Sequence, residues 1–412
     1  MLYWTSPEIG RKMADVALSL DRYTKERWEF DSVLANYGGF RPTLSTLEEI
    51  GCAAESLEKE LAPYDGLKGM YLKGTARALK CFTRVMCGDQ LSYEEKLRDI
   101  MELPLQPIPE AKYEALRNTV DRQLTDLGYQ GGVMEKIAAW KETWKIPAGE
   151  VISFARKYLD ACKRATLDRV TQLPEEDGIQ ELYGVSGEFW SGHSAYLGGF
   201  KGRLRFNLDR PWSAPIFINT LAHEGYPGHQ VSYCRWDWLF QQEKYPVEAS
   251  WYMLASPANT VFEGLPENGT HFLGWDQPGS TANEIPEEMK AQLSLAWDVS
   301  DLQRIIQTRA CMMYQAEGAS QEDVMDYFRR TRVFSEVEAV NTFRFFSHPV
   351  QHIQYPSYYY GRWMVREAWD LCPEEQRQNL FALLYDTPMS NQTFVEGVSQ
   401  LIGAPFRPYD NI

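Results

Sequence analysis

Apolar residues recur at helical spacing along most of the first 175 residues. Near the end of this region, Val151, Phe154, Tyr158 and Leu159 would lie on one face of a helix. Polar residues fill most of the remaining positions, which is the pattern of a helix that packs one face against a core. We therefore expect the N-terminal region to be a series of amphipathic helices.

Residues typical of helix ends delimit several of these helices. Ser45-x-x-Glu48 and Ser92-x-x-Glu95 have the sequence of a capping box, in which two side chains satisfy backbone amides of the first turn. The segment 109–128 begins with proline and ends with glycine, the usual order at the two ends of a helix. These signals predict three helix starts.

The pattern changes between Gly184 and Pro211, where glycines become frequent and short apolar stretches alternate with polar residues. RLRFNL, residues 203–208, has the period of two that is typical of a half-buried strand. We expect a hairpin around Lys201-Gly202. An extended peptide could pair with the edge of the 203–208 strand through its backbone.

Helical spacing returns after this region and continues from about Pro286 to the C-terminus, where Ser320 and Asp323 form another cap. The predicted fold is therefore mainly α: a large helical body with a deep cleft and a small β hairpin or sheet. We expect residues 1–175 to be an N-terminal helical region and residues 176–412 to carry the functional site, in one continuous body.

Composition and charge restrict the possible partners. The net charge is −15 and no basic cluster exceeds two residues, which argues against nucleic acid and anionic membrane surfaces. No apolar run approaches the 18 residues of a membrane-spanning helix. The seven cysteines are scattered without a C-x-x-C pair, and no signal peptide is evident, so we expect a cytoplasmic protein. The oligomeric state stays open.

Candidate chemistry lies in the stretch INTLAHEGYPGHQVSYCRWDW, residues 218–238. In the His-Glu-x-x-His pattern of zinc peptidases the histidines are four residues apart on one helix face. Here His223 and His229 are six apart, which on a regular helix would leave them about 120° from each other. Pro227 and Gly228 interrupt the helix between them. A break at this point would allow both imidazoles to reach one ion.

A zinc site of this type needs a third protein ligand. Glu263, Glu267 and His271 follow at i, i+4 and i+8, but Pro266 and Gly269 make a regular helix doubtful. Glu263 is therefore the preferred ligand. On spacing alone, a solvated helix carboxylate is the favoured interpretation of Glu263.

Three blocks of the sequence resemble the DUF885 family of bacterial proteins, which is similar to the mainly helical gluzincin metallopeptidases. The family has an HExxPGH helix, an F-x-E-G segment and a later Q-x-x-x-Y-x-x-G segment. HEGYPGH and FEG match the first two, and Gln354, Tyr358 and Gly361 match the third, within HIQYPSYYYGRW. The resemblance covers about residues 180 to 400.

The resemblance implies a site with one Zn2+ ion. By this likeness His223, His229 and Glu263 would be the zinc ligands, Glu224 the general base and Tyr358 the group that stabilises the oxyanion. The chain departs from the family pattern at four positions. These are Gln230, Leu265, Pro266 and Thr270, which affect the expected substrate preference more than the ligands.

The expected function is zinc-dependent hydrolysis of peptide bonds, with Glu224 activating water. Five further residues are predicted to bind the peptide substrate: Asn207, His352, Gln354, Tyr359 and Arg362. Tyr359 and Tyr360 are substitutes for Tyr358, and Arg304 is a second candidate for a substrate carboxylate. An ordinary role in packing or a salt bridge is the simpler reading for each of these residues.

Two other functions remain open. The first is a non-catalytic protein that keeps a metallopeptidase fold and binds peptides or other ligands. The second is a metal-independent hydrolase acting on sugars, although no paired carboxylate motif supports it. A second metal site at His348 and His352, which are four residues apart, is remote, and His193 is an equally weak candidate.

Overall fold

The computed structural model describes residues 1–410 and is mainly α-helical, as the sequence predicts. The helices before the larger sheet are α1 (Pro7–Trp28), α2 (Leu47–Leu61), α3 (Gly66–Cys87), α4 (Tyr93–Lys96), α5 (Glu110–Asp126), α6 (Val133–Thr143) and α7 (Val151–Arg169). Those around the candidate site are α8 (Ala214–Glu224), α9 (His229–Gln241), α10 (Asn259–Glu267) and α11 (Gly269–Phe272). The remaining helices are α12 (Glu287–Gln315), α13 (Gln321–Thr331), α14 (Glu336–Phe346), α15 (Gln351–Gln354), α16 (Ser357–Leu371), α17 (Arg377–Asp386) and α18 (Asn391–Ile402).

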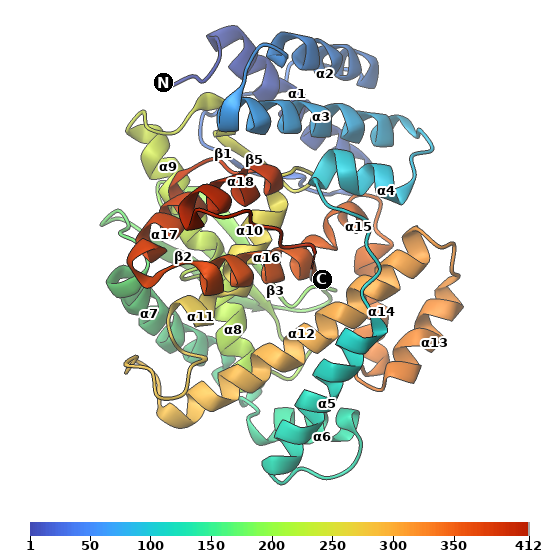
Figure 1. Cartoon of the computed structure of the whole chain (residues 1–412), viewed down its shortest axis with the longest axis vertical. Helices are drawn as coiled ribbons and strands as arrows, with labels where there is room; N and C mark the ends of the chain where they lie inside the picture. The colour runs from blue at the N-terminus through green and yellow to red at the C-terminus, as the bar shows by residue number, and fades with distance from the viewer. Residues whose placement is uncertain (411–412) are drawn as a thin grey trace.

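Figure 1 shows α1, α2 and α3 together at one end of the molecule, with α10 and α16 near its middle and the long α12 crossing below them. A π-helical turn at Leu97–Met101 follows α4, and short 3-10 turns lie at Ala148–Glu150, Val247–Ala249 and Glu374–Gln376.

The strands form two small sheets. Strands β1 (Val33–Asn36) and β5 (Trp251–Met253) pair antiparallel. The other sheet has the order β2-β4-β3, with β2 (Gly178–Val185) parallel and β3 (Gly192–Gly198) antiparallel to β4 (Lys201–Asn207). The sequence pattern did not predict β1 or β2, because neither shows a clean alternation of apolar and polar residues.

The predicted strand exists as β4, but two details of the hairpin were wrong. The turn lies at Gly199-Phe200 rather than Lys201-Gly202, since both turn residues have positive φ (58° and 65°) and Gly198 already pairs with Lys201. Turns of this kind match the twist of the flanking strands. The second error concerns the edge: β4 is the central strand, so a peptide cannot add to it, whereas β3 is an edge strand.

One of the predicted capping boxes is displaced by a residue. Helix α2 is capped by Thr46, whose side chain accepts a hydrogen bond from the Glu49 amide while the Glu49 carboxylate accepts one from the Thr46 amide. The prediction of Ser45 and Glu48 was therefore out of frame. The box that begins at Ser92 is confirmed.

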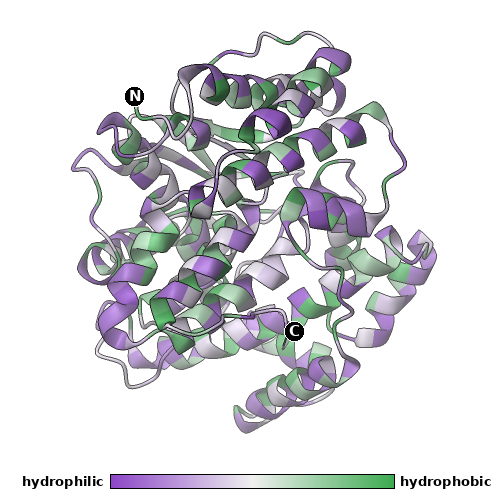
Figure 2. Ribbon diagram, turned by 45° about the horizontal axis from the view of Figure 1, so that its top comes forward, coloured by the Kyte–Doolittle hydropathy of each residue, from purple (hydrophilic) through white to green (hydrophobic). Residues whose placement is uncertain are grey.

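The hydrophobic core crosses the sequence division at residue 175. One buried cluster contains both Met13 of α1 and Tyr360 of α16, and a second contains Val151 of α7 and Val398 of α18. Helices in Figure 2 carry hydrophobic and hydrophilic residues on different faces, as helices packed on a shared core do. The division into two regions stays a prediction from sequence pattern, and so does the deep cleft. Within residues 1–410 no helix combines the length and apolar character needed to cross a bilayer.

Candidate metal centre

The motif helix is interrupted between its two histidines. Helix α8 ends at Glu224 and α9 begins at His229. In the connection the Gly228 amide donates a hydrogen bond to the Ala222 carbonyl (3.0 Å). A Cβ at Gly228 would overlap the backbone carbonyls of Ala222 and His223, so only glycine allows this close return of the chain.

Buried polar contacts hold the connection in place. The Tyr226 hydroxyl donates to Asp177 (2.8 Å), which lies just before β2, and the Tyr385 hydroxyl of α17 donates to the Pro227 carbonyl (2.6 Å). Asp177 also forms a salt bridge with Lys163 of α7 (2.7 Å). The break is therefore tied to the sheet and to two other helices.

As a result the side chains of His223 and His229 converge. Their ring centroids are 4.7 Å apart, and the rings are nearly perpendicular. The Glu263 carboxylate of α10 lies between them, with its Oε2 atom 3.5 Å from Nε2 of His223 and 3.6 Å from Nε2 of His229. One ligand atom from each residue lies within 4.8 Å of the others. The sequence-predicted triad therefore meets at one point.

The donor set fits a zinc ion. Oε2 of Glu263 is buried and has no hydrogen-bond partner among the described residues, although a buried carboxylate oxygen normally has one. A cation at the point where the three side chains meet would satisfy this oxygen. Two imidazoles and one carboxylate are also a usual ligand set for catalytic zinc.

The charges around the three converging side chains favour a positive charge between them. Burial raises the pKa of Glu263, but His223 and His229 outweigh it and lower the pKa to about 2. Burial by itself would lower the pKa of His223, but the nearby carboxylates Glu263, Glu224 and Glu267 raise it overall.

Glu267 lies behind His223. Its Oε1 atom is 3.7 Å from Nδ1 of His223, on the side of the ring away from Glu263. Arg304 of α12 and Arg362 of α16 each form a 2.6 Å salt bridge with the same carboxylate. Burial raises the pKa of Glu267, but the two arginines and His223 lower it to about 2. A carboxylate at this position fixes the orientation of the imidazole.

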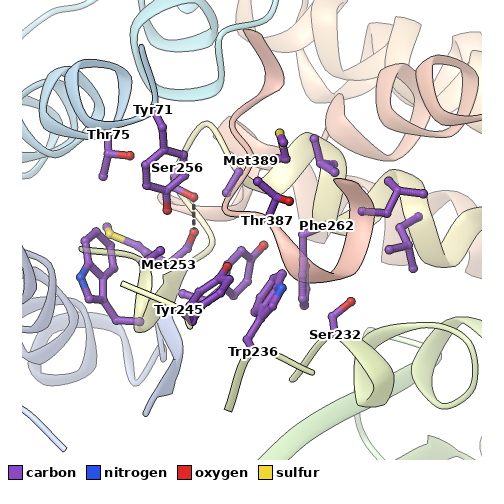
Figure 3. A pocket seen from close by; sticks show the side chains of 17 residues that line it. Tyr71, Thr75, Ser232, Trp236, Tyr245, Met253, Ser256, Phe262, Thr387 and Met389 are labelled. Carbon is purple, nitrogen blue, oxygen red and sulfur yellow. Dashed lines mark hydrogen bonds between the residues drawn. The ribbon is translucent and has the colours of Figure 1, made fainter. Parts of the chain in front are cut away.

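The other imidazole is held by ring stacking. His229 stacks on Phe262 of α10 with centroids 4.2 Å apart and an interplanar angle of 19°, and Tyr252 packs against the same Phe262 ring at 4.0 Å. Nδ1 of His229 is buried and has no hydrogen-bond partner in residues 1–410. Phe262 also lines a small pocket of about 30 Å³. Figure 3 shows it there, with Ser232 and Trp236 among the other lining side chains. A cavity of this size has room for a water molecule or two.

Glu224 is buried next to the triad at the end of α8. Strand β3 packs against its side chain, because a Cβ at Gly192 would come within 3.1 Å of the Glu224 Cγ atom. Burial raises the pKa of Glu224, while His223 and His229 oppose the rise. The edge strand β3 therefore runs beside the predicted general base.

Tyr358 reaches the same region from α16. Burial raises the pKa of its hydroxyl, and the nearby Glu263 and Glu224 add to the rise. The Arg304 guanidinium lies 4.7 Å from the centre of the Tyr358 ring. The structure thus brings His223, His229 and Glu263 together with Glu224 beside them, and Tyr358 lies near enough for the charges of Glu263 and Glu224 to raise its pKa.

Two predicted substrate-binding residues are engaged inside the protein. The Asn207 amide donates to the backbone carbonyls of Glu188 (2.6 Å) and Trp190 (3.3 Å), so it braces the β2–β3 loop. Arg362 is buried and contacts Glu267, the Trp297 carbonyl (2.7 Å) and Asp301 (3.4 Å). Its guanidinium is thus occupied by internal partners.

The other three predicted residues are buried in different surroundings. Nδ1 of His352 lies 2.9 Å from the His348 carbonyl and its Nε2 lies 3.4 Å from Lys96, while burial and Lys96 lower its pKa to about 4. The Oε1 atom of the Gln354 side chain and the Tyr359 hydroxyl are buried and have no hydrogen-bond partner within residues 1–410. Their roles in binding stay predictions.

Residues at the departures from the family pattern have partners of their own. The Gln230 amide donates to Asp177 (2.9 Å), and the Thr270 hydroxyl donates to Asn219 of α8 (2.9 Å). Leu265 is buried in the core, and Pro266 is accommodated within α10 near its end. None of the four belongs to the converging triad.

The remaining histidines lie outside the triad. Nδ1 of His348 accepts the backbone amides of Val350 and Gln351 at the start of α15, so it precedes that helix as predicted. His271 pairs with Asp276 (2.9 Å). His193 in β3 is close enough to His229 for its pKa to be affected, and burial, Arg205 and His229 lower that pKa to about 4.

Comparison with known proteins supports the fold only. No family model and no curated protein matches the sequence. Among solved structures the chain is similar to a protein of Colwellia psychrerythraea described as a "putative lipoprotein", with a TM-score of 0.56 and 12% sequence identity over 96% of this chain and 75% of that one. At this identity the likeness is one of fold. The resemblance to the DUF885 family and the cytoplasmic location stay predictions.

Proposed function

We propose that the protein is a zinc-dependent peptide-bond hydrolase in which His223, His229 and Glu263 hold one Zn2+ ion. The supporting observation is the convergence of their three donor atoms within 4.8 Å of one another, around a buried carboxylate oxygen that lacks a hydrogen bond. When bound, zinc supplies Lewis-acid chemistry, polarising a carbonyl group and lowering the pKa of water.

The side chains around the triad have complementary roles. Glu224 accepts the proton of the attacking water and passes it to the leaving amine. Tyr358 donates a hydrogen bond to the oxyanion that forms at the substrate carbonyl. The substrate is a peptide that lies in extended form along the edge of β3, next to Glu224.

Metal analysis of the purified protein tests the centre. We expect about one zinc ion per chain, and loss of zinc when His223, His229 or Glu263 is replaced by alanine. His348→Ala is the matched control, because this histidine lies outside the triad, and it should retain zinc. Retention of zinc by all three ligand variants would contradict the proposal.

Hydrolysis is tested separately with zinc loaded. The parent protein should cleave members of a broad peptide library, and Glu224→Gln should retain zinc but lose cleavage by at least about a hundredfold, because a general base typically contributes 10²–10⁴. Absence of cleavage by the zinc-loaded parent would favour the alternative of a non-catalytic peptide-binding protein. Unchanged cleavage by Glu224→Gln would refute the mechanism.

A further inference from the structure

Arg205 lies on the three-stranded sheet, and the described residues provide no anionic partner for its guanidinium group. It lies on β4 directly opposite His193 of β3, and its guanidinium is 5.2 Å from the centre of the Trp190 ring. Its Nε atom is buried and has no hydrogen-bond acceptor within residues 1–410. The guanidinium as a whole has no carboxylate at salt-bridge distance in the same residues. Arg205 is half-buried, and a buried N–H donor such as its Nε–H group is normally paired, so this guanidinium is available to an anion from outside the chain.

A neighbouring arginine makes the contrast clear. Arg203 lies two residues earlier on the same face of β4 and forms two hydrogen bonds with Glu181 (2.5 and 3.3 Å). The chain has 57 acidic residues against 42 basic ones, so an unpaired arginine next to a candidate site is not explained by a shortage of carboxylates. Arg304 and Arg362, the candidates from sequence, are both paired with Glu267.

The position of Arg205 connects it with the metal centre. His193, its cross-strand partner, directly follows Gly192, where a Cβ would come within 3.1 Å of the Glu224 side chain. Nδ1 of His193 is also buried and has no partner in the described part of the chain. A peptide along the edge of β3 would therefore pass within reach of this cluster.

The loop between β2 and β3 supplies Trp190 to the cluster. Arg210 holds the loop through the Phe189 carbonyl (2.5 Å) and the Ser191 hydroxyl (3.1 Å). The Phe345 ring contacts Phe189 at 5.8 Å and Tyr358 at 6.0 Å. The loop thus lies on the side of the site where Tyr358 is found.

We propose that Arg205, with His193 and Trp190 beside it, binds a carboxylate group of the peptide substrate. This inference rests on the proposed function. A guanidinium that lies over an aromatic ring keeps its in-plane N–H groups for a bidentate contact, which suits a carboxylate. The carboxylate belongs to an acidic side chain or to the C-terminus of the peptide, and the two sources are separated by experiment.

Binding to the Glu224→Gln protein, loaded with zinc, tests the proposal without cleavage. Four degenerate hexapeptide pools are compared by affinity selection and mass spectrometry: pools with or without Asp and Glu, each with a free or an amidated C-terminus. We expect at least about tenfold stronger retention when the required carboxylate is present, as for a charge-assisted hydrogen bond. Dependence on the acidic residues identifies a side chain, and dependence on the free end identifies the C-terminus.

Variants at two arginines complete the test. In the same Glu224→Gln background, Arg205→Gln should lose the preference for peptides that carry the carboxylate. Arg205→Lys should keep part of it, because lysine retains the positive charge but cannot make the bidentate contact. Arg203→Gln is the matched control and should keep the preference in full. A preference that survives Arg205→Gln, or is absent from the parent, overturns the inference even where the parent cleaves peptides. A preference that depends on Arg205 in a protein that cleaves nothing supports this binding site and refutes the hydrolase.

Discussion

Gly264 of α10 and Gly361 of α16 are in direct backbone contact. A Cβ at Gly264 would overlap the Gly361 carbonyl, and a Cβ at Gly361 would overlap the Thr260 carbonyl. The Asn268 side chain joins the two helices as well, donating to the carbonyls of Gly264 and Arg362 (2.9 Å each). Glu263, which precedes Gly264, and Tyr358, three positions before Gly361, therefore lie on two helices in direct contact.

Replacing Gly264 by alanine should therefore damage both the fold and the metal centre. The added methyl group forces α10 and α16 apart, and overpacking of this kind costs about 2 kcal/mol of unfolding free energy. Because Glu263 is adjacent, we also expect weaker zinc binding. Chemical denaturation and zinc titration measure the two effects.

Gly51→Ala is the control for this prediction. Gly51 lies within α2, where a Cβ would make an ordinary contact of 3.8 Å with Thr83. Alanine is favoured over glycine in a helix interior by about 1 kcal/mol, so this variant should be slightly more stable and bind zinc normally. Equal stability of the two variants would contradict the importance of the helix contact.

Gly228→Ala should act on the centre through the helix break. A methyl group at this position has no space beside the carbonyls of Ala222 and His223, so the connection must open and His229 must move away from His223. We expect a loss of zinc affinity of at least about tenfold, the lower range found when support of a ligand is removed. Zinc titration of the folded variant measures this loss. Unchanged zinc affinity would show that the connection between α8 and α9 can rearrange without moving the His229 imidazole.

The sequence predicted those features of the site that are local. Pro227-Gly228 indicated an interruption that would allow an odd histidine spacing, and the structure confirms that the two imidazoles converge. Glu263 was preferred among three candidates because its position in the second turn was the least affected by Pro266. The convergence of residues so far apart followed from the family resemblance, because no spacing rule connects them.

Features that depend on tertiary packing could not be predicted. The strand at 203–208 was recognised, but its place between two others depends on β2, whose sequence shows no clear alternation. Arg362 was a candidate for a substrate carboxylate, and only the fold reveals that Glu267 and Asp301 already occupy it. Arg205 was missed because an arginine without a partner cannot be recognised until its neighbours are known.

Glu267→Gln should weaken zinc binding without removing a ligand. The carboxylate lies 3.7 Å from Nδ1 of His223, and its loss leaves the imidazole less firmly oriented. Replacement of such supporting groups typically costs 10- to 100-fold in metal affinity, and we expect about that range. Competition with a zinc-binding dye measures it.

The control for Glu267 is a carboxylate that also pairs with arginine but is remote from the centre. Glu317 forms exposed salt bridges with Arg309 (2.6 and 3.0 Å), so Glu317→Gln should leave zinc affinity unchanged. Similar losses in both variants would mean that general destabilisation, not the contact with His223, is responsible. Glu267→Gln should also be less stable, because Arg304 and Arg362 lose a buried partner.

Asp301 of α12 should make the stability of the protein fall between about pH 4 and pH 6. Its side chain is fully buried, and neither carboxylate oxygen has a hydrogen bond within residues 1–410. Burial raises the pKa of Asp301 from 3.8 to about 6, although Arg362 and Lys112 oppose the rise. The folded chain then holds this proton more tightly than the unfolded chain. The contribution of the protonated Asp301 side chain to the unfolding free energy is therefore complete below pH 4, and it is lost as the pH rises through about 6.

Asp301→Asn removes this titration and provides the measurement. A rise of about two pKa units corresponds to about 3 kcal/mol, so the unfolding free energy of the parent should decrease by about that amount relative to the variant between pH 4 and pH 7. Chemical denaturation of both proteins at several pH values in this range gives the difference directly. The comparison uses only the change with pH, so a constant offset from altered contacts with Arg362 does not affect it. Parallel curves for the two proteins would show that the carboxylate is already ionised at pH 4 in the folded chain.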